Sequence, residues 1–226
     1  MALKEDITGI LKLAFEKIQY AYDNHKEGLN GKKIFVSQEI LSRLIFPSYS
    51  DGNENAGNTD EHEIVAPKTR ISEQELRFSF VDAFNEYCNK YNCKYLYSIE
   101  TPTKAKYKDF SKSKGNPTPI PHKDNVNGRS GEFDMVVYDE KLQRICLIEF
   151  KANNASPLDH RKDFVKLAEK EEGGKDVLRY FVEVLASYTN RTLQNIKNEK
   201  LKFKDNNTIF VCYSLEQHED ISNKLN

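Results

Sequence analysis

The sequence lacks the long apolar runs and the excess of one charge that mark several classes of protein. No stretch of its 226 residues approaches the roughly 20 apolar residues of a membrane span, and the N-terminus has no apolar leader. The formal net charge is -1, so the chain as a whole is not a polycation. We therefore expect a cytoplasmic protein without a membrane segment, in which any nucleic-acid surface arises from a local concentration of positive charge.

Cysteine and histidine patterns give no sign of a zinc site. The four cysteines lack paired spacing, and we interpret them as reduced thiols. The phosphate-binding glycine loop, the Gly-x-Ser-x-Gly elbow and the His-Glu-x-x-His motif are also absent. The histidines are scattered, and we expect all five to be surface residues: His25, His62, His122, His160 and His218.

The chain is long enough for one large domain with a helical extension, and its 13 Phe and 12 Tyr can build a core. Apolar residues at helical spacing predict an N-terminal helix over 7–22 and a second, short helix over 37–46 that ends before Pro47. This extension, residues 1–47, packs either against the main domain or against a second copy in a homodimer. Residues 48–66 are polar and predict a flexible loop or linker, so we place the main domain at 67–226.

The most informative stretch is a predicted β-hairpin formed by residues 131–138 and 144–151. Its second strand is apolar on both faces from Ile145 to Ile148, as in the middle of a covered sheet. If the hairpin folds symmetrically about 141–142, Val136 faces Leu147 and Tyr138 faces Ile145.

Carried further, the same register opposes Asp134 to Glu149 and Glu132 to Lys151, with Cβ atoms about 5 Å apart. Two buried carboxylates at that distance repel each other, and a divalent cation between them would reverse the sign of the interaction. Hard oxygen ligands favour Mg²⁺ or Mn²⁺.

These residues resemble the signature of the PD-(D/E)XK nuclease superfamily: Asp134 on one strand, then Glu149-Phe150-Lys151 at the end of the next. Phe133 stands where many members have Pro. The resemblance implies that Asp134 and Glu149 bind the metal with help from the Phe150 carbonyl, and that Lys151 orients or activates the attacking water. A Glu-x-Lys triplet on a strand is otherwise a solvated ion pair.

A capping box formed by Ser72 and Glu75 predicts a helix that extends to about residue 89. Glu73 falls on its buried stripe, whereas Glu75 falls to one side. Many members of the resembled superfamily have a glutamate here that completes the metal site, so Glu73 is a candidate ligand and Glu75 stays an alternative. A simpler interpretation is that both acids stabilise the positive end of the helix.

Between a strand predicted over 94–100 and the hairpin lies a stretch rich in Lys, Pro and Gly, which predicts a long loop over 101–130. Its excess of positive charge favours contact with a phosphate backbone. The alternative is a solubilising loop. The candidate nucleic-acid contacts are Lys104, Lys106, Lys112, Lys114 and Arg129.

After the hairpin we expect helices over 159–173 and 175–190, a strand over 208–213 and a short C-terminal helix. Asp163 and Lys166, one turn apart, either support the site or form a solvated pair. The resulting order matches the restriction-endonuclease-like αβββαβ core, a mixed sheet flanked by helices in the α/β class. The resemblance implies a metal-dependent endo- or exonuclease, with DNA favoured as substrate. The alternatives are a catalytically inactive nucleic-acid-binding or assembly subunit, and a protein-interaction domain.

Overall fold

The computed structural model describes residues 2–29, 40–46, 48–49, 68–69, 71–108, 122–153, 157–202 and 207–225. Among these residues the main feature is a mixed sheet of seven strands in the order β4-β3-β5-β6-β7-β8-β9. A separate two-stranded ladder pairs β1 (Ser48–Tyr49) with β2 (Lys68–Thr69). The strands of the large sheet are β3 (Leu96–Lys108), β4 (His122–Lys123), β5 (Arg129–Tyr138), β6 (Arg144–Ala152), β7 (Leu178–Leu185), β8 (Thr208–Ser214) and β9 (Glu219–Asp220).

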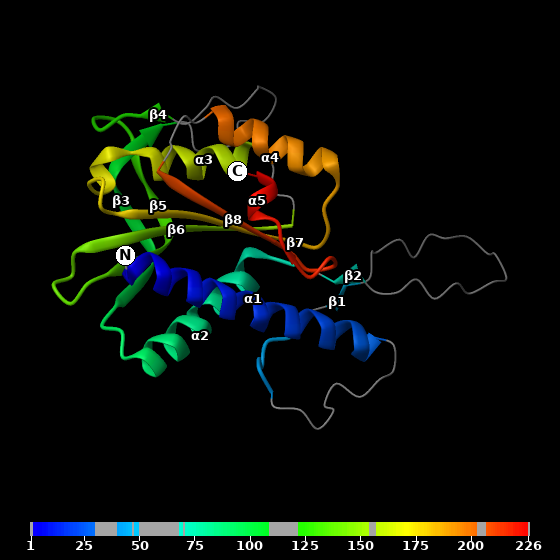
Figure 1. Ribbon diagram of the computed structural model, residues 1–226. Helices are drawn as coiled ribbons and strands as arrows, with labels where there is room; N and C mark the ends of the chain where they lie inside the picture. The colour runs from blue at the N-terminus through cyan, green and yellow to red at the C-terminus, as the bar shows by residue number, and fades with distance from the viewer. Residues whose placement is uncertain are drawn as a thin grey trace.

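Helices cover both faces of this sheet (Figure 1). They are α1 (Ala2–Leu29), α2 (Glu73–Tyr91), α3 (Pro157–Ala168), α4 (Asn190–Lys202) and α5 (Ser222–Leu225), with a 3₁₀ turn, η1, at Lys170–Glu172. One core cluster joins α1 and α2 to the first face, and a second joins α3, α4 and α5 to the other. Strands β6, β7 and β8 are parallel, so two crossover connections join them: α3 lies between β6 and β7, and α4 lies between β7 and β8. The predicted α/β class is confirmed.

The N-terminal helix is part of the main core. Its stripe of Ile7, Ile10, Ala14 and Ile18 is fully buried and packs with residues of α2 and the sheet. Of the two roles considered for it, packing against the main domain is the one that the structure shows.

The second predicted helix is wrong where the chain is described, because residues 40–46 form no helix. Ile40 and Ile45 are exposed, and the Leu41 carbonyl accepts a hydrogen bond from Lys17 Nζ at 3.2 Å. Four apolar residues over less than two turns do not overcome the cost of helix nucleation without a buried face. Residues 37–39 and most of the predicted linker lie outside the described residues.

The predicted helix over 175–190 is also wrong, since residues 178–185 form the central parallel strand β7. A run that is apolar all round is compatible with a buried helix or a buried strand. Tyr180, Phe181, Val182 and Val184 are the aromatic and β-branched residues that favour the strand. Helix α4 was missed because its apolar stripe is narrow, with Leu193 and Ile196 as its contributions to the core.

The long loop predicted over 101–130 is corrected in its described parts. Strand β3 continues to Lys108, and β4 and the start of β5 pair with its outer half. Thr101, Thr103, Ala105 and Tyr107 alternate with exposed residues, the pattern of a strand that is covered on one side. Pro102 obscured this alternation in the sequence. Residues 109–121, with Lys112 and Lys114, lie outside the described residues.

The antiparallel hairpin forms, and its register is as predicted from Met135 to Val137, with Val136 opposite Leu147. The predicted pairs of Asp134 with Glu149 and Glu132 with Lys151 are not part of the ladder, whose last pair is Met135 with Ile148. At its turn Tyr138 pairs with Arg144 instead of Ile145, because the register shifts between Val137 and Tyr138. None of the described helices has the length and apolar character needed to cross a bilayer.

Candidate active site

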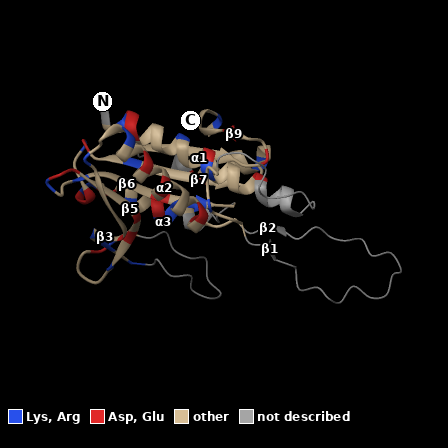
Figure 2. Cartoon of the chain, turned by 90° about the horizontal axis from the view of Figure 1, so that it is seen from below, with Lys and Arg blue, Asp and Glu red and all other residues tan. Residues whose placement is uncertain are grey.

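A buried network of charges lies around the middle of β5 and the C-terminal end of β6, with contributions from helices on both faces of the sheet. Its residues come from four elements, and acidic and basic segments lie together there in Figure 2. Helix α2 contributes charged side chains to the network from the first face of the sheet, and α3 contributes charged side chains from the second face. The members are Glu73 and Arg77 of α2, Asp134 of β5, Glu149 and Lys151 of β6, and Asp163 and Lys166 of α3.

Asp134 is held at the point where the β5–β6 ladder ends. The last backbone pair is Met135 with Ile148, and beyond it the Asp134 carboxylate accepts the Phe150 N–H at 2.7 Å. Its other oxygen accepts a hydrogen bond from Arg77 Nη2 at 2.7 Å. Beyond the end of the ladder, the Asp134 side chain thus accepts the Phe150 N–H, and the Asp134 carboxylate lies next to the backbone of the residue after Glu149.

The strand alternation assumed for this part of β5 does not hold. Phe133 and Val136, three residues apart, both pack into the cluster on the α3 face. A regular strand would send them to opposite faces. Asp134 lies between Phe133 and Val136, within this irregular part of the strand. The irregularity explains how Arg77 of α2, on the other face of the sheet, reaches the Asp134 carboxylate.

Glu149 is the most deeply buried carboxylate of the network, with 1% of its surface exposed. Its Oε1 lies 2.6 Å from Lys166 Nζ. Burial, and then repulsion from Asp163 and Asp134, raises the pKa of Glu149 well above its usual value, although Lys166 opposes the shift. The two predicted metal ligands are linked through the backbone, because Asp134 accepts the N–H of Phe150, the residue that follows Glu149.

Lys151 is surrounded by oxygen atoms. Its ammonium group donates to the Phe150 carbonyl at 3.1 Å and pairs with Asp163 at 2.7 Å and Glu73 at 3.1 Å. Burial lowers the pKa of Lys151, but the charges of Asp163 and Glu73 outweigh burial and raise it above its usual value. In this arrangement of acids Lys151 is therefore a fixed positive charge at neutral pH.

Helix α3 contributes more than the sequence indicated. The interpretation of Asp163 and Lys166 as a solvated pair is wrong, since they are only 5% and 7% exposed. Asp163 joins both lysines, with Oδ2 at 2.7 Å from Lys151 and Oδ1 at 2.9 Å from Lys166. Burial raises the pKa of Asp163, but the two ammonium groups outweigh burial and lower it. In the sequence, one feature could have indicated this role: Asp163 and Lys166 lie one turn apart in the helix that follows the strand ending in Glu149-Phe150-Lys151.

The two glutamates at the start of α2 have different partners. The carboxylate of Glu75 accepts the Ser72 N–H at 2.8 Å, which caps the helix. Glu73 instead reaches Lys151, and its side chain is 39% exposed. Burial raises the pKa of Glu73, with Lys151 opposing and Asp134 and Asp163 adding to the rise. Of the two alternatives, Glu73 is the one that joins the network.

His160 departs from the prediction that all histidines are surface residues. It is 4% exposed and lies with Nε2 at 3.2 Å from Oε1 of Glu183, which is fully buried. Glu183 stands opposite Lys151 in the β6–β7 ladder. This pair extends the buried polar region from β6 to the neighbouring strand β7.

The donor atoms of the network suit a hard divalent ion. Asp134, Glu149 and the Phe150 carbonyl offer oxygen ligands, and Mg²⁺ is usually held by one or two carboxylates together with water. Two buried oxygens, Glu149 Oε1 and Asp163 Oδ2, have an ion pair with a lysine, at 2.6 and 2.7 Å, and no further hydrogen-bond partner within the described residues. Across those same residues, no three His, Cys, Asp or Glu side chains are grouped as a metal site. The oxygen chemistry fits the ion, and internal cations already neutralise the same carboxylates.

The structure describes three of the five predicted nucleic-acid contacts: Lys104, Lys106 and Arg129. Lys104 and Lys106 are exposed on the same side of β3, two residues apart, and Arg129 is exposed at the start of β5. By contrast, Lys108 and Lys123 are paired with acidic side chains, at 2.6 Å for Lys108 and Asp124. The positive charge of this region is therefore concentrated in fewer residues than the sequence count indicated.

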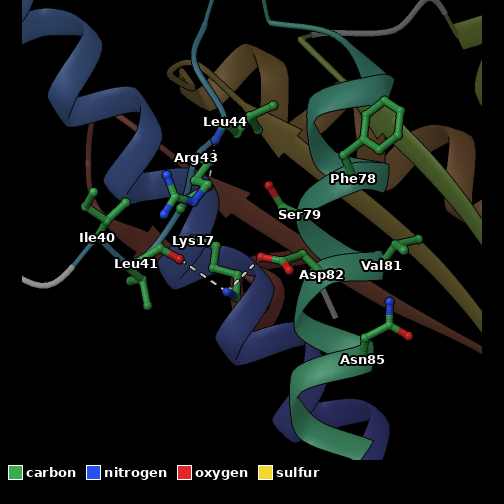
Figure 3. A pocket seen from close by; sticks show the side chains of 11 residues that line it. Lys17, Ile40, Leu41, Arg43, Leu44, Phe78, Ser79, Val81, Asp82 and Asn85 are labelled. Carbon is green, nitrogen blue, oxygen red and sulfur yellow. Dashed lines mark hydrogen bonds and ion pairs between the residues drawn. The ribbon is translucent and has the colours of Figure 1, made fainter. Parts of the chain in front are cut away.

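A cavity of about 610 Å³ lies elsewhere, between α1, α2 and residues 40–46 (Figure 3). Lys17 spans it and pairs with Asp82 and Glu86, each at 2.8 Å. No residue of the buried network lines this cavity. We therefore place the candidate chemistry in the network and not in the cavity.

Comparison with known proteins adds no family to these observations. No protein-family model matches the chain, and searches for similar curated proteins and similar solved structures each return no significant match. The assignment of function therefore depends on the site itself.

Proposed function

We propose that this protein is a divalent-metal-dependent nuclease that hydrolyses phosphodiester bonds of nucleic acid, with DNA as the preferred substrate. The observation that carries the proposal is the convergence of Asp134, Glu149, Lys151 and Glu73 in one network at the end of the hairpin. When the two-residue strand β4 and the short turn η1 are left out, the order α2-β3-β5-β6-α3-β7 is that of the αβββαβ core of the restriction-endonuclease-like fold, which supports the same proposal.

The proposed ligands of the metal are Asp134, Glu149 and the Phe150 carbonyl, with Glu73 in an outer position. A bound Mg²⁺ or Mn²⁺ would lower the pKa of a coordinated water and neutralise charge on the leaving oxygen. The chain's own contribution is to hold these oxygens in place: Arg77 and the Phe150 N–H fix Asp134, and burial fixes Glu149.

Lys151 acts as a positioned cation. Its contacts with Phe150, Asp163 and Glu73 fix the ammonium group beside the proposed ligands. A charge fixed in this way orients the attacking water and stabilises the negative charge that develops on the phosphate. Asp163 positions both lysines, because one of its oxygens contacts each of them.

Nucleic acid would approach along the exposed side of β3. In the β3–β5 ladder Pro102 stands opposite Glu132, whose carbonyl accepts a hydrogen bond from Lys166 at 2.7 Å. Lys104 and Lys106 follow Pro102 along the strand, roughly 7 and 13 Å away at the usual rise per residue. Their charges would contact the phosphate backbone and position the substrate without reading its sequence.

One observation favours the second candidate, a catalytically inactive nucleic-acid-binding subunit. Arg77 and Lys166 already neutralise Asp134 and Glu149, as in a site that has replaced its metal with internal cations. The two candidates make opposite predictions about metal binding.

The test combines calorimetry with Mn²⁺ and a nicking assay on plasmid and branched DNA. Metal binding together with nicking supports the nuclease, whereas nucleic-acid binding without metal supports the inactive subunit. In the Lys151→Ala variant we expect folding and metal binding to persist and the cleavage rate to fall by about 100- to 1000-fold, the usual effect of losing one charge-stabilising group. Lys162→Ala, on a half-buried lysine of α3, is the matched control.

A further inference from the structure

The ammonium group of Lys166 occupies a site made of three oxygens. It lies 2.6 Å from Glu149 Oε1, 2.9 Å from Asp163 Oδ1 and 2.7 Å from the Glu132 carbonyl. The oxygens come from β6, α3 and β5, and the face of the Phe133 ring lies 5.9 Å away. Oxygen atoms of different elements thus converge on one buried positive charge.

The network contains more acid than base in its described residues. Four carboxylates, those of Glu73, Asp134, Glu149 and Asp163, face the three cations of Arg77, Lys151 and Lys166. A fifth carboxylate, that of the exposed Glu100, also pairs with Arg77, at 3.1 Å. Lys166 carries the contact that neutralises Glu149. A divalent ion that binds Glu149 therefore meets a carboxylate whose charge the protein already compensates, and two cations cannot share it without mutual repulsion.

We propose that Lys166 is an internal competitor of the divalent ion: it holds Glu149 in the metal-free protein and releases it when the ion binds. This inference rests on the proposed function and names how ion binding at that site is regulated. Lys166 is a positioning residue in this scheme, because it acts through Glu149.

The contacts of Lys166 make such an exchange feasible without unfolding the site. When the ammonium group leaves Glu149 it retains Asp163, its neighbour one turn earlier on the same helix, and the Glu132 carbonyl. The added positive charge would then be compensated by the phosphate of a bound nucleic acid. We therefore expect the ion and the nucleic acid each to strengthen the binding of the other.

The test is the affinity for Mn²⁺ measured by calorimetry, without nucleic acid. In Lys166→Met we expect the dissociation constant to be about 10- to 100-fold lower than in the wild type, since one opposing charge near the ion is lost. Lys162→Met makes the same substitution on a lysine for which the described residues give no ion pair to the network, and we expect it to leave the constant unchanged. Lys166→Arg keeps the charge and should bind Mn²⁺ no more tightly than the wild type.

Folding of the variant gives a second measurement. Lys166→Met leaves Glu149 without its cation, so we expect its melting temperature in EDTA to fall and to recover with saturating Mn²⁺ more than that of the wild type. A variant that folds only with Mn²⁺ supports the proposal. A variant that stays unfolded in saturating Mn²⁺ overturns it, because the ion then cannot replace the ammonium group.

The inference and the proposed function fail separately in this design. Equal Mn²⁺ affinity in Lys166→Met and the wild type, together with metal-dependent nicking by the wild type, overturns the inference and leaves the nuclease intact. Tighter binding in the variant without nicking by the wild type supports the inference and overturns the nuclease. If none of these proteins binds Mn²⁺, both are overturned.

Discussion

Replacement of Asp163 by asparagine tests whether the buried network holds the site together. Asp163 is 5% exposed, and its oxygens lie 2.7 Å from Lys151 and 2.9 Å from Lys166. Breaking one buried pair typically costs about 3–5 kcal/mol, because the remaining charge is left uncompensated. Here Lys151 keeps Glu73 and Lys166 keeps Glu149, so we expect a smaller loss of about 2–3 kcal/mol in the free energy of unfolding.

The assay is urea denaturation in EDTA at neutral pH, with Asp176→Asn as the control because Asp176 is exposed. A double-mutant cycle of Asp163→Asn with Lys166→Met then isolates the pair, and we expect a coupling energy of about 1–3 kcal/mol. A destabilisation below about 0.5 kcal/mol, the value of a solvated pair, would refute the account of Asp163 as a buried support.

Three further predictions concern binding, thiol chemistry and metal removal. Lys104→Glu combined with Lys106→Glu should weaken nucleic-acid binding and reduce the slope of log affinity against log salt by about 2, whereas charge reversal at the exposed Lys12 should not. Burial raises the pKa of Cys88 to about 12, and Cys146 and Cys212 are buried as well, so Ellman's reagent should modify Cys93 first in the native protein. EDTA should abolish nicking and leave nucleic-acid binding measurable by gel shift, because the exposed lysines do not depend on the ion.

The elements that were predicted correctly have either a regular spacing of apolar residues or a sequence motif that is specific to one structure. The 3.6-residue stripe of α1 and the capping box of α2 each have one structural solution, and both helices are present. The hairpin was predicted because two strand-like runs flank a polar turn. Strand β7 was missed because an apolar run without a period does not distinguish helix from strand, and its place between two parallel strands is a tertiary effect.

Much of the candidate site follows from the sequence, because a covered strand that ends in charged residues is unusual. Asp134, Glu149, Lys151 and Glu73, the residues selected from the sequence, all belong to the network, and their catalytic and metal-binding roles stay predictions. What the sequence did not show is the role of residues from other elements. Arg77 sits on the buried side of α2 among apolar neighbours, and nothing in the linear sequence indicates that it turns towards β5.

The most direct test of the central claim is anomalous diffraction from a crystal soaked in Mn²⁺. We expect one peak within about 2.1–2.5 Å of carboxylate oxygens of both Asp134 and Glu149, a usual range for hard cations bound by oxygen. We expect the Lys166 ammonium group to have moved away from Glu149 in that crystal. Saturating Mn²⁺ that leaves no peak between these two carboxylates, with Lys166 still on Glu149, would contradict the account.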